Sequence, residues 1–168
     1  MNEIINLSEE TVILARKQFL NVTGGINKNL YFIESGSLRI FVMNDDQEQI
    51  VRLGYEGNFI VALDSFLTGK PSEFLIQAIK RTVLKVITKQ QIDEFLKDES
   101  NQKLWTEILE NIIIQKMERE VDLLTNSPSE RYERVLKRSP QLFQKIPNKH
   151  IANYLRMSPE TLWRLKKS

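Results

Sequence analysis

The sequence contains no cysteine and a single histidine, His150. The absence of cysteine excludes disulfides, thiolate zinc sites, iron–sulfur clusters and cysteine-based catalysis. One histidine cannot supply the cluster of imidazoles on which many metalloenzymes depend. We therefore expect no metal, no cofactor and no enzymatic activity.

Long apolar runs are absent as well. No run approaches the roughly 20 residues that a membrane-spanning helix needs. The first residues, MNEIINLSEET, lack the basic start and apolar core of a signal peptide. These features predict a cytoplasmic protein with no membrane partner. A chain of 168 residues with 41% hydrophobic and 27% charged side chains is long enough for one or two small globular domains.

The small net charge of +2 is unevenly distributed along the chain. Residues 126–168 carry ten Lys and Arg against three Asp and Glu, whereas the preceding residues carry 14 basic and 19 acidic side chains. A basic module joined to an acidic body is typical of nucleic-acid-binding proteins. The alternative is a basic segment that is merely solvated.

Alternating apolar residues predict a series of short strands in the first half of the chain. The predicted strands, which turn residues separate, are 30–33, 37–43, 49–53, 59–63, 73–79 and 82–87. So many short strands favour a β-sandwich or jelly-roll barrel. Before them, residues 8–19 are predicted to form an amphipathic helix capped by Ser8. Asp45 and Asp46 are expected to lie in a hairpin turn and not to act as an acid–base pair.

After Thr88 the pattern becomes helical. Residues 89–97 predict one helix, and after a break at 98–100 a helix of about seven turns follows. Its apolar stripe is broader than one contact surface needs, so we expect it to pair with a second copy of the chain. The residues expected in that pairing are Trp105, Ile108, Ile112, Met117, Val121 and Leu124. The alternative is that the whole stripe is buried within one chain. Residues 129–145 predict another helix, interrupted at Pro140.

The C-terminal stretch 147–168 reads as two short helices joined by a tight turn. Ile151 and Leu155 fall at helical spacing in the first helix, and Leu162 and Leu165 do so in the second. Ser158 followed by Pro159 marks the start of the second helix. This arrangement predicts a helix-turn-helix, whose second helix enters the major groove of DNA.

The order of these parts resembles the Crp/Fnr superfamily of bacterial transcription regulators. The specific segment is IANYLRMSPETLWRL, which is similar to the helix-turn-helix signature of that family, together with the helix start Ser129-Glu130-Arg131-Tyr132. YFIESGSLRIF is similar to a hairpin of the family's sensor domain. The similarity runs from about Leu30 to the end of the chain.

This resemblance implies an α+β protein with a jelly-roll β-barrel sensor domain of the cyclic-nucleotide-binding type, a long dimerisation helix and a C-terminal helix-turn-helix. The corresponding domains would be residues 1–97, 98–126 and 127–168. The implied function is sequence-specific transcription regulation by a homodimer on a palindromic operator. Double-stranded DNA is the expected partner, and RNA polymerase is a further candidate.

The same resemblance assigns base reading to Glu160 and Arg164, which lie one helical turn apart on a shared face. Arginine can bond bidentately to guanine, and glutamate can accept from the amino group of cytosine. The alternative is a surface ion pair. The residues expected to contact the DNA backbone are Asn148, Lys149, Ser158, Thr161, Lys166 and Lys167.

Several positions depart from the family pattern. Arg156 stands where the turn commonly carries glycine, which would cost up to about 1 kcal/mol if the backbone there is left-handed. Trp163 replaces a small residue on the DNA-facing side, so we expect an altered base preference or a partly covered face. The sequence ends at Ser168, directly after the second helix, so we expect no β-hairpin wing.

The expected effector pocket departs most. A Gly-Glu pair and a later Arg hold cyclic nucleotides in this family, whereas this chain offers Gly57-Asn58 and then Ser72-Glu73. A glutamate would repel a phosphate, so we expect no binding of cyclic AMP. Two alternatives to a DNA-binding regulator remain open. One is a ligand- or protein-binding module on a degenerate roll. The other is an enzyme on a jelly-roll scaffold of the cupin kind, but such a site needs a histidine-rich metal cluster that one histidine cannot supply.

Overall fold

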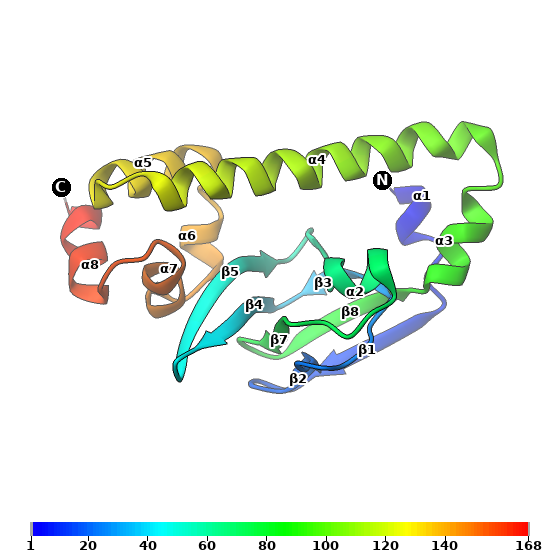
Figure 1. Cartoon of the computed structure of the whole chain (residues 1–168), viewed down its shortest axis with the longest axis horizontal. Coiled ribbons are helices and arrows are strands. Elements are labelled where there is room, and N and C mark those ends of the chain that lie inside the picture. Colours follow the sequence, from blue (N-terminus) through cyan, green and yellow to red (C-terminus); the bar gives the residue numbers. More distant parts are fainter. Residues whose placement is uncertain (1, 168) are drawn as a thin grey trace. The chain divides into compact units, whose positions relative to one another are not determined.

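A computed structural model describes residues 2–167, which form two compact units divided between Gln102 and Lys103. We call the first the roll unit and the second the C-terminal unit. The roll unit contains helices α1 (Asn2–Ile5), α2 (Leu63–Thr68) and α3 (Lys89–Phe95). Its strands are β1 (Glu10–Leu14), β2 (Phe19–Asn21), β3 (Leu30–Ser35), β4 (Ser37–Asn44), β5 (Gln47–Tyr55), β6 (Phe59–Ile60), β7 (Leu75–Ala78) and β8 (Thr82–Ile87) (Figure 1).

The strands of the roll unit form two antiparallel four-stranded sheets, with the orders β1-β8-β3-β6 and β2-β7-β4-β5. Alternate residues of both sheets face a shared apolar core, because successive side chains of a strand point to opposite faces. The fully or almost fully buried core side chains include Leu14, Ile33, Leu38, Ile60, Ile76, Leu84 and Val86. The two sheets remain distinct, so the predicted jelly-roll barrel is a two-sheet roll.

Two tight turns set the register of the central strands. Between β3 and β4, Gly36 has a φ of 101°, and a Cβ atom there would lie 2.5 Å from the Cα of Thr82. Only glycine fits this position. Between β4 and β5, Asp45 and Asp46 both have positive φ, as the hairpin turn with right-handed strand twist requires. The two acids therefore lie in a turn, as expected from the sequence.

The helix predicted over residues 8–19 is wrong. Residues Glu10–Leu14 form β1, which pairs along its whole length with β8. The β-branched run Thr11, Val12 and Ile13 favours an extended backbone, and pairing with β8 buries Leu14 in the core. Ser8 does not cap a helix, because its hydroxyl donates to the carbonyl of Glu10 at 2.9 Å.

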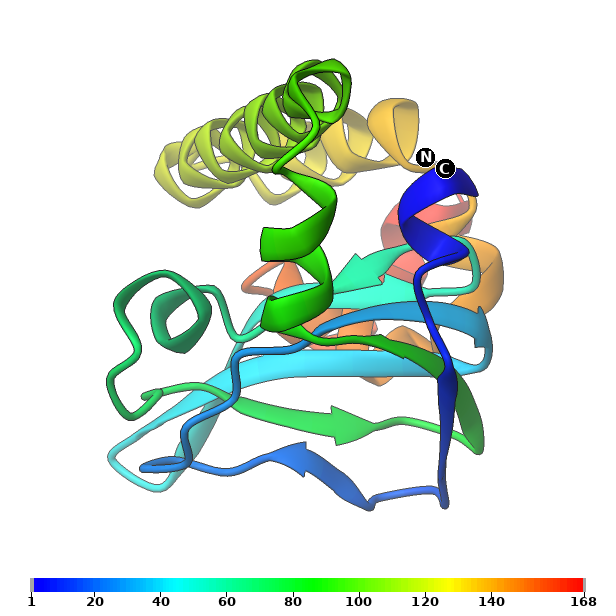
Figure 2. The same cartoon turned by 90° about the vertical axis from the view of Figure 1, so that its right-hand side faces the viewer.

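Two of the later strands are shorter than predicted, whereas β8 has the predicted bounds 82–87. The run 59–63 contributes only Phe59–Ile60, because the chain turns into the unpredicted helix α2 at Leu63. The run 73–79 contributes Leu75–Ala78. After β8 the chain passes directly into α3 (Figure 2), which begins with a capping box of Thr88 and Gln91.

The C-terminal unit is helical. Its elements are the long helix α4 (Glu99–Leu124), whose first turn lies before the division between the units, and α5 (Pro128–Arg138), α6 (Leu142–Lys145), α7 (Asn148–Tyr154) and α8 (Pro159–Lys167). The predicted break at 98–100 lies at the start of α4, where the carboxylate of Asp98 accepts from the amide of Ser100 at 2.9 Å. The break at Pro140 separates α5 from α6.

The described residues contain no candidate for a membrane span. Within residues 2–167, no helix combines the length and the apolar character that crossing a lipid bilayer would require.

Candidate nucleic-acid interface

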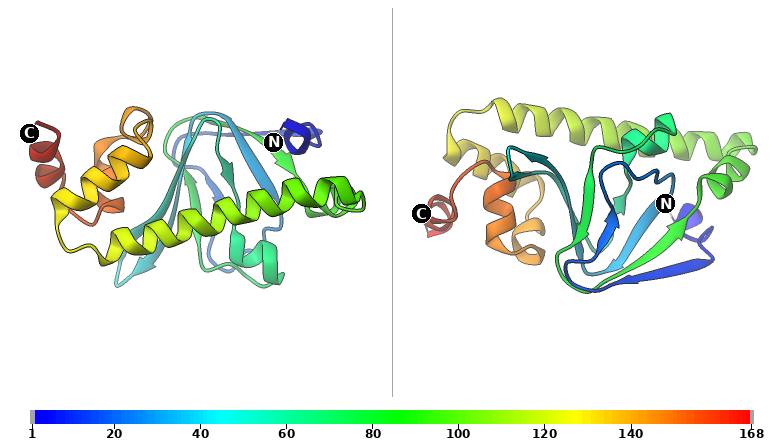
Figure 3. Two further views of the ribbon diagram at one scale, coloured as in Figure 1. Left: turned by 90° about the horizontal axis from the view of Figure 1, so that it is seen from above. Right: turned by 60° about the horizontal axis from the view of Figure 1, so that its bottom comes forward.

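Helices α7 and α8 form the predicted helix-turn-helix and follow one another at the C-terminal end of the chain, in orange to red in Figure 3. Ile151 and Ala152 of α7, its C-cap residue Leu155, and Leu162 of α8 are fully buried. The first three side chains lie at i, i+1 and i+4 and the last in the middle of α8, so each helix buries one face. The opposite face of α8 is therefore left for solvent or a partner.

The turn between the two helices has a left-handed residue. The amide of Arg156 donates to the carbonyl of Asn153, and the amide of Met157 donates to that of Ala152, both at 3.0 Å. This pair of bonds is a Schellman motif, which places the residue after the helix end in the left-handed region. Arg156 accordingly has a φ of 56°. Arg156 therefore has the left-handed backbone at which a residue other than glycine is expected to lower stability.

Ser158 fixes the start of α8. Its hydroxyl accepts from the amide of Thr161 at 3.1 Å and lies 3.1 Å from the hydroxyl of Thr161. This is the N-cap that the Ser-Pro pair predicts. A hydrogen bond from its own backbone N–H, and a second from the Ser158 hydroxyl, lower the pKa of the Glu160 carboxyl. Glu160 is therefore an anion at neutral pH.

The solvent face of α8 holds the predicted base-reading residues. Glu160 and Arg164 are both exposed, and Trp163 beside them is 54% exposed. An open hollow lies on this face, lined by Pro159, Glu160, Trp163 and Arg164. The face thus combines an acid, a base and an apolar ring within two helical turns.

The residues predicted for backbone contacts lie around this face. Asn148 and Lys149 begin α7 and are exposed, and Lys166 donates to the side chain of Asn148 at 2.9 Å. The ammonium of Lys167 lies 3.8 Å from the centre of the Trp163 ring. Ser158 is exposed. Thr161 is half-buried, and its amide donates to the Ser158 hydroxyl in the N-cap.

Arg131, which the sequence marks only as part of a helix start, joins the ends of two other helices. Its guanidinium donates to the carbonyls of Thr125 and Asn126 after α4, and to those of Leu155 and Arg156 after α7. Carbonyls at helix C-termini lack partners in the helix and carry partial negative charge. Arg131 is 8% exposed, and four backbone carbonyls accept hydrogen bonds from its buried positive charge.

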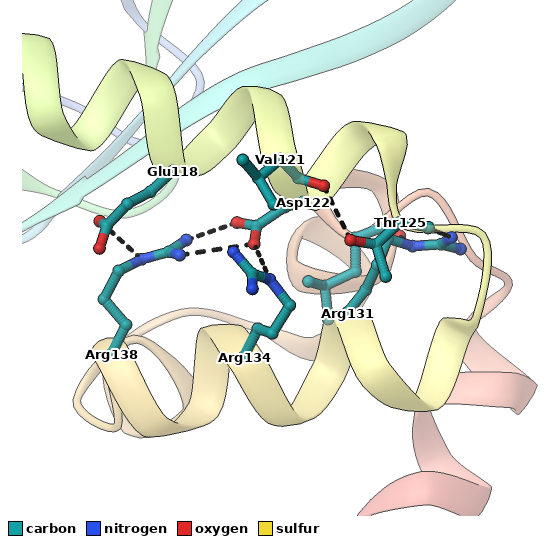
Figure 4. A network of polar contacts seen from close by, with 8 residues as sticks. Glu118, Val121, Asp122, Thr125, Arg131, Arg134 and Arg138 are labelled. Carbon is teal, nitrogen blue, oxygen red and sulfur yellow. Dashed lines mark hydrogen bonds and ion pairs between the residues drawn. The ribbon is translucent and has the colours of Figure 1, made fainter.

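A second group of charges joins α4 to α5 (Figure 4). Asp122 of α4 is fully buried and accepts from Arg134, at 3.1 Å, and from Arg138 of α5. Glu118, one turn earlier, lies 3.3 Å from Arg138. Burial opposes the charge of Arg138, but the hydrogen bond and charge of Asp122 outweigh it and raise the pKa of that guanidinium. The end of α4 and the helix α5 are thus held in antiparallel contact.

Exposed apolar side chains lie along α4, most of them in its C-terminal half. Of the residues predicted for dimerisation, Met117, Val121 and Leu124 are 62%, 46% and 74% exposed. Trp105 and Ile112 are half-buried, and Ile108 is buried within the chain at 7% exposure. Ile113 and Ile114 are exposed as well. Ile113 belongs to the predicted apolar stripe, but neither residue was among those expected in the pairing.

In the predicted effector pocket, both residue pairs make structural contacts. Gly57 and Asn58 form the turn between β5 and β6, where Gly57 has a φ of 87° and Asn58 accepts from the amide of Tyr55. Ser72 is 1% exposed and precedes β7.

The polar donors near Ser72 are taken by Asp64 of α2. Its carboxylate accepts from the Ser72 hydroxyl at 2.9 Å, from the Glu73 amide at 3.0 Å and from the Ser65 amide at 2.8 Å. An internal carboxylate therefore engages the hydroxyl of Ser72 and the amide of Glu73, both in the predicted pocket. Glu73 itself is exposed. Sequence reasoning missed Asp64, although an acid in this segment was visible.

Comparison with known proteins agrees with this architecture. Residues 11–99 match the model of the cyclic nucleotide-binding domain, and the chain belongs to that family. No curated protein matches the sequence.

Solved structures with a similar fold include those of Crp/Fnr-type regulators. FixK2 from Bradyrhizobium japonicum has a TM-score of 0.76 and 15% identity, over 94% of this chain and 82% of that one. A CooA mutant from Carboxydothermus hydrogenoformans has a TM-score of 0.72 and 13% identity, over 98% and 77%. A transcriptional regulator of the CRP family from Thermus thermophilus has a TM-score of 0.67 and 16% identity, over 93% and 82%. The resemblance stated from the sequence is confirmed at the level of the fold.

Proposed function

We propose that the chain is a sequence-specific, DNA-binding transcriptional regulator that acts as a homodimer. The observation that carries the proposal is the division of α8 into two faces. Leu162 anchors one face, while Glu160 and Arg164 stand exposed one turn apart on the other. In a helix-turn-helix this outer face meets the base edges of the major groove. The resemblance of the fold to the CRP-family transcriptional regulator from Thermus thermophilus supports the same function.

The proposed homodimer rests on α4. Ile114, Met117, Val121 and Leu124 follow one another at intervals of three and four residues, which is the spacing of a coiled-coil seam. All four are exposed in the single chain. Two chains paired along this seam would present two copies of α8, and two recognition helices bind half-sites about 34 Å apart on a palindromic operator.

We further propose that the roll unit does not bind cyclic AMP. Asp64 already occupies the donors near Ser72, and Glu73 adds a negative charge beside them. A cyclic phosphate would have to displace a carboxylate that the protein itself supplies, without an arginine in that segment to compensate.

The test is fluorescence-anisotropy binding to duplexes selected from a random pool, at two salt concentrations. Arg164→Ala should cost about 1–3 kcal/mol on the selected duplex and little on unrelated duplexes, because it removes a base contact. Lys149→Ala is the matched control. It should weaken binding to all duplexes alike and reduce the salt dependence, because a phosphate contact carries no sequence information.

Two results bear on the rest of the proposal. A duplex cut to one half-site should bind far more weakly than the complete site, because a homodimer uses both recognition helices. Weak, strongly salt-dependent binding that ignores Arg164→Ala would contradict the proposal. It would favour the alternative of a ligand- or protein-binding module built on the roll.

A further inference from the structure

A large apolar side chain, Trp163, stands on the exposed face of α8 beside the two candidate base-reading residues. Pro159, Trp163 and Lys167 follow one another at intervals of four residues and form one row along the helix. Glu160 and Arg164 form the adjacent row. Rows of this kind leave a groove between them. The open hollow lined by Pro159, Glu160, Trp163 and Arg164 lies in that groove.

Trp163 does not serve the core of the C-terminal unit. It is 54% exposed, whereas its neighbour Leu162 is fully buried and anchors the helix. The ammonium of Lys167 lies over the indole ring at 3.8 Å, and Lys167 does not line the hollow. The apolar surface of Trp163 and Pro159 is therefore available to a ligand that enters the groove between the two rows.

The major groove of DNA offers one apolar group at the edges of its bases. This group is the 5-methyl of thymine, whereas the other groups there are hydrogen-bond donors and acceptors. Arg164 matches the acceptors of guanine, and Glu160 matches the amino group of cytosine. Neither polar side chain recognises a methyl group, but Pro159 and Trp163 give the hollow apolar walls on the side opposite Glu160 and Arg164.

Resting on the DNA-binding function proposed above, we propose that Trp163 and Pro159 make α8 a reader of pyrimidine 5-methyl groups. The methyl enters the hollow beside the base pair that Arg164 reads. Thymine carries this group in every genome, and 5-methylcytosine carries the same group where cytosine is modified. The shared chemistry is an apolar substituent on the major-groove edge of a pyrimidine.

The experiment replaces thymines of the selected duplex, one at a time, with 2′-deoxyuridine. The replacement removes the methyl and leaves every hydrogen-bonding group in place. At a contacted position the parent should lose about fourfold in affinity, which is the worth of one buried methyl-sized group. Trp163→Ala should bind the thymine and uracil duplexes equally well. The Trp163→Leu variant should keep part of the difference, because leucine retains an apolar surface.

A second arm distinguishes the two sources of the methyl. Each cytosine of the site is replaced with 5-methylcytosine, and the parent is compared with Trp163→Ala. A gain in affinity that requires Trp163, with no loss at any uracil, assigns the methyl to modified cytosine. A loss at uracil that requires Trp163 assigns it to thymine. Leu67→Ala is the control, because it truncates a 64% exposed side chain in the roll unit and should change neither result.

The outcome that overturns the proposal is selective binding that ignores both methyl replacements, or a methyl effect that survives Trp163→Ala. A chain that binds no duplex selectively overturns the proposed function together with this inference, so the two failures are distinguishable. Thermal unfolding of Trp163→Ala completes the test. An exposed residue should leave the midpoint nearly unchanged, and the uracil series on the parent needs no variant at all.

Discussion

Each unit of the chain contains an aspartate that accepts several hydrogen bonds. In one unit these bonds engage groups of the predicted site, and in the other they do not. In the roll unit, Asp64 accepts from Ser65, Ser72 and Glu73, so the donors of the predicted effector pocket are already engaged. In the C-terminal unit, Asp122 accepts from Arg134 and Arg138. Those bonds join α4 to α5 and involve no residue of α8.

The two units differ in which polar groups remain exposed, where a ligand or DNA could contact them. Around Asp64 the internal contacts engage groups of the predicted effector pocket. Around Asp122 and Arg131 the internal contacts hold α4, α5 and α7 together, and Glu160 and Arg164 of α8 remain exposed. An internal charge can therefore close one candidate site and support another. The structure, and not the residue types alone, decides between the two outcomes.

The largest expected effect comes from Arg131→Ala, which removes the support of the C-terminal unit. Four carbonyls lose a charged donor, and leaving buried polar groups without partners is costly, so we expect a loss of about 3 kcal/mol in unfolding free energy. Urea unfolding followed by tryptophan fluorescence measures this loss, because Trp105 and Trp163 both lie in the C-terminal unit.

The matched control for this variant is Arg134→Ala, one turn away on the same helix. Arg134 is more exposed than Arg131 and shares Asp122 with Arg138, so its loss should cost about 1 kcal/mol. Equal losses for the two variants would contradict the role assigned to Arg131.

An intermediate effect is expected from Asp64→Ala in the roll unit. Three donors lose their acceptor, but the site is only half-buried and water can replace part of the bonding, so we expect a loss of about 1–2 kcal/mol. Urea unfolding followed by circular dichroism measures it. Asp93→Ala is the control, because Asp93 forms only an exposed ion pair with Lys89.

The same samples test the effector pocket. Millimolar cyclic AMP should leave the unfolding midpoint of the parent unchanged, because only a ligand that binds the folded state raises it. A rise in the midpoint would contradict the prediction, since it would show that the roll unit binds cyclic AMP despite the contacts of Asp64.

The smallest expected effect is a gain in stability from Arg156→Gly. Arg156 adopts a φ of 56°, where a side chain is strained and glycine is not. Allowing for the greater freedom of glycine in the unfolded chain, we expect a gain of about 0.5–1 kcal/mol. Tryptophan fluorescence in urea measures it. Arg156→Ala keeps a Cβ atom and should give no comparable gain, so equal gains for both variants would refute the explanation by backbone strain.

Much of the architecture could be predicted from local patterns. The alternation of apolar residues with a period of two correctly predicted most strands of the roll unit. The helical spacing, together with Ser158 and Pro159, correctly predicted the helix-turn-helix. The first helix was mispredicted because residues 8–19 satisfy a helical spacing as well as a strand spacing. Pairing with β8, which lies about 70 residues later in the chain, decides in favour of the strand. Such a pairing is invisible in a local window.

For the candidate site, too, some features could be predicted from the sequence and others could not. The residue types of α8 indicate which side chains can read bases, because hydrogen-bonding chemistry belongs to the residue and its helical spacing. The roles of Asp64, Asp122 and Arg131 could not be predicted, because each depends on donors or carbonyls from segments that only folding brings together.

The sequence by itself determined the class of fold, the limits of the helix-turn-helix and the chemical character of its outer face. These properties follow from local periodicity, capping residues and composition. Only the tertiary structure decided that Asp64 occupies the donors of the roll, that Arg131 joins two helix ends and that Trp163 borders an open hollow. Burial and hydrogen-bond partners arise from contacts across the chain, and these contacts determine whether a polar group is available to a partner.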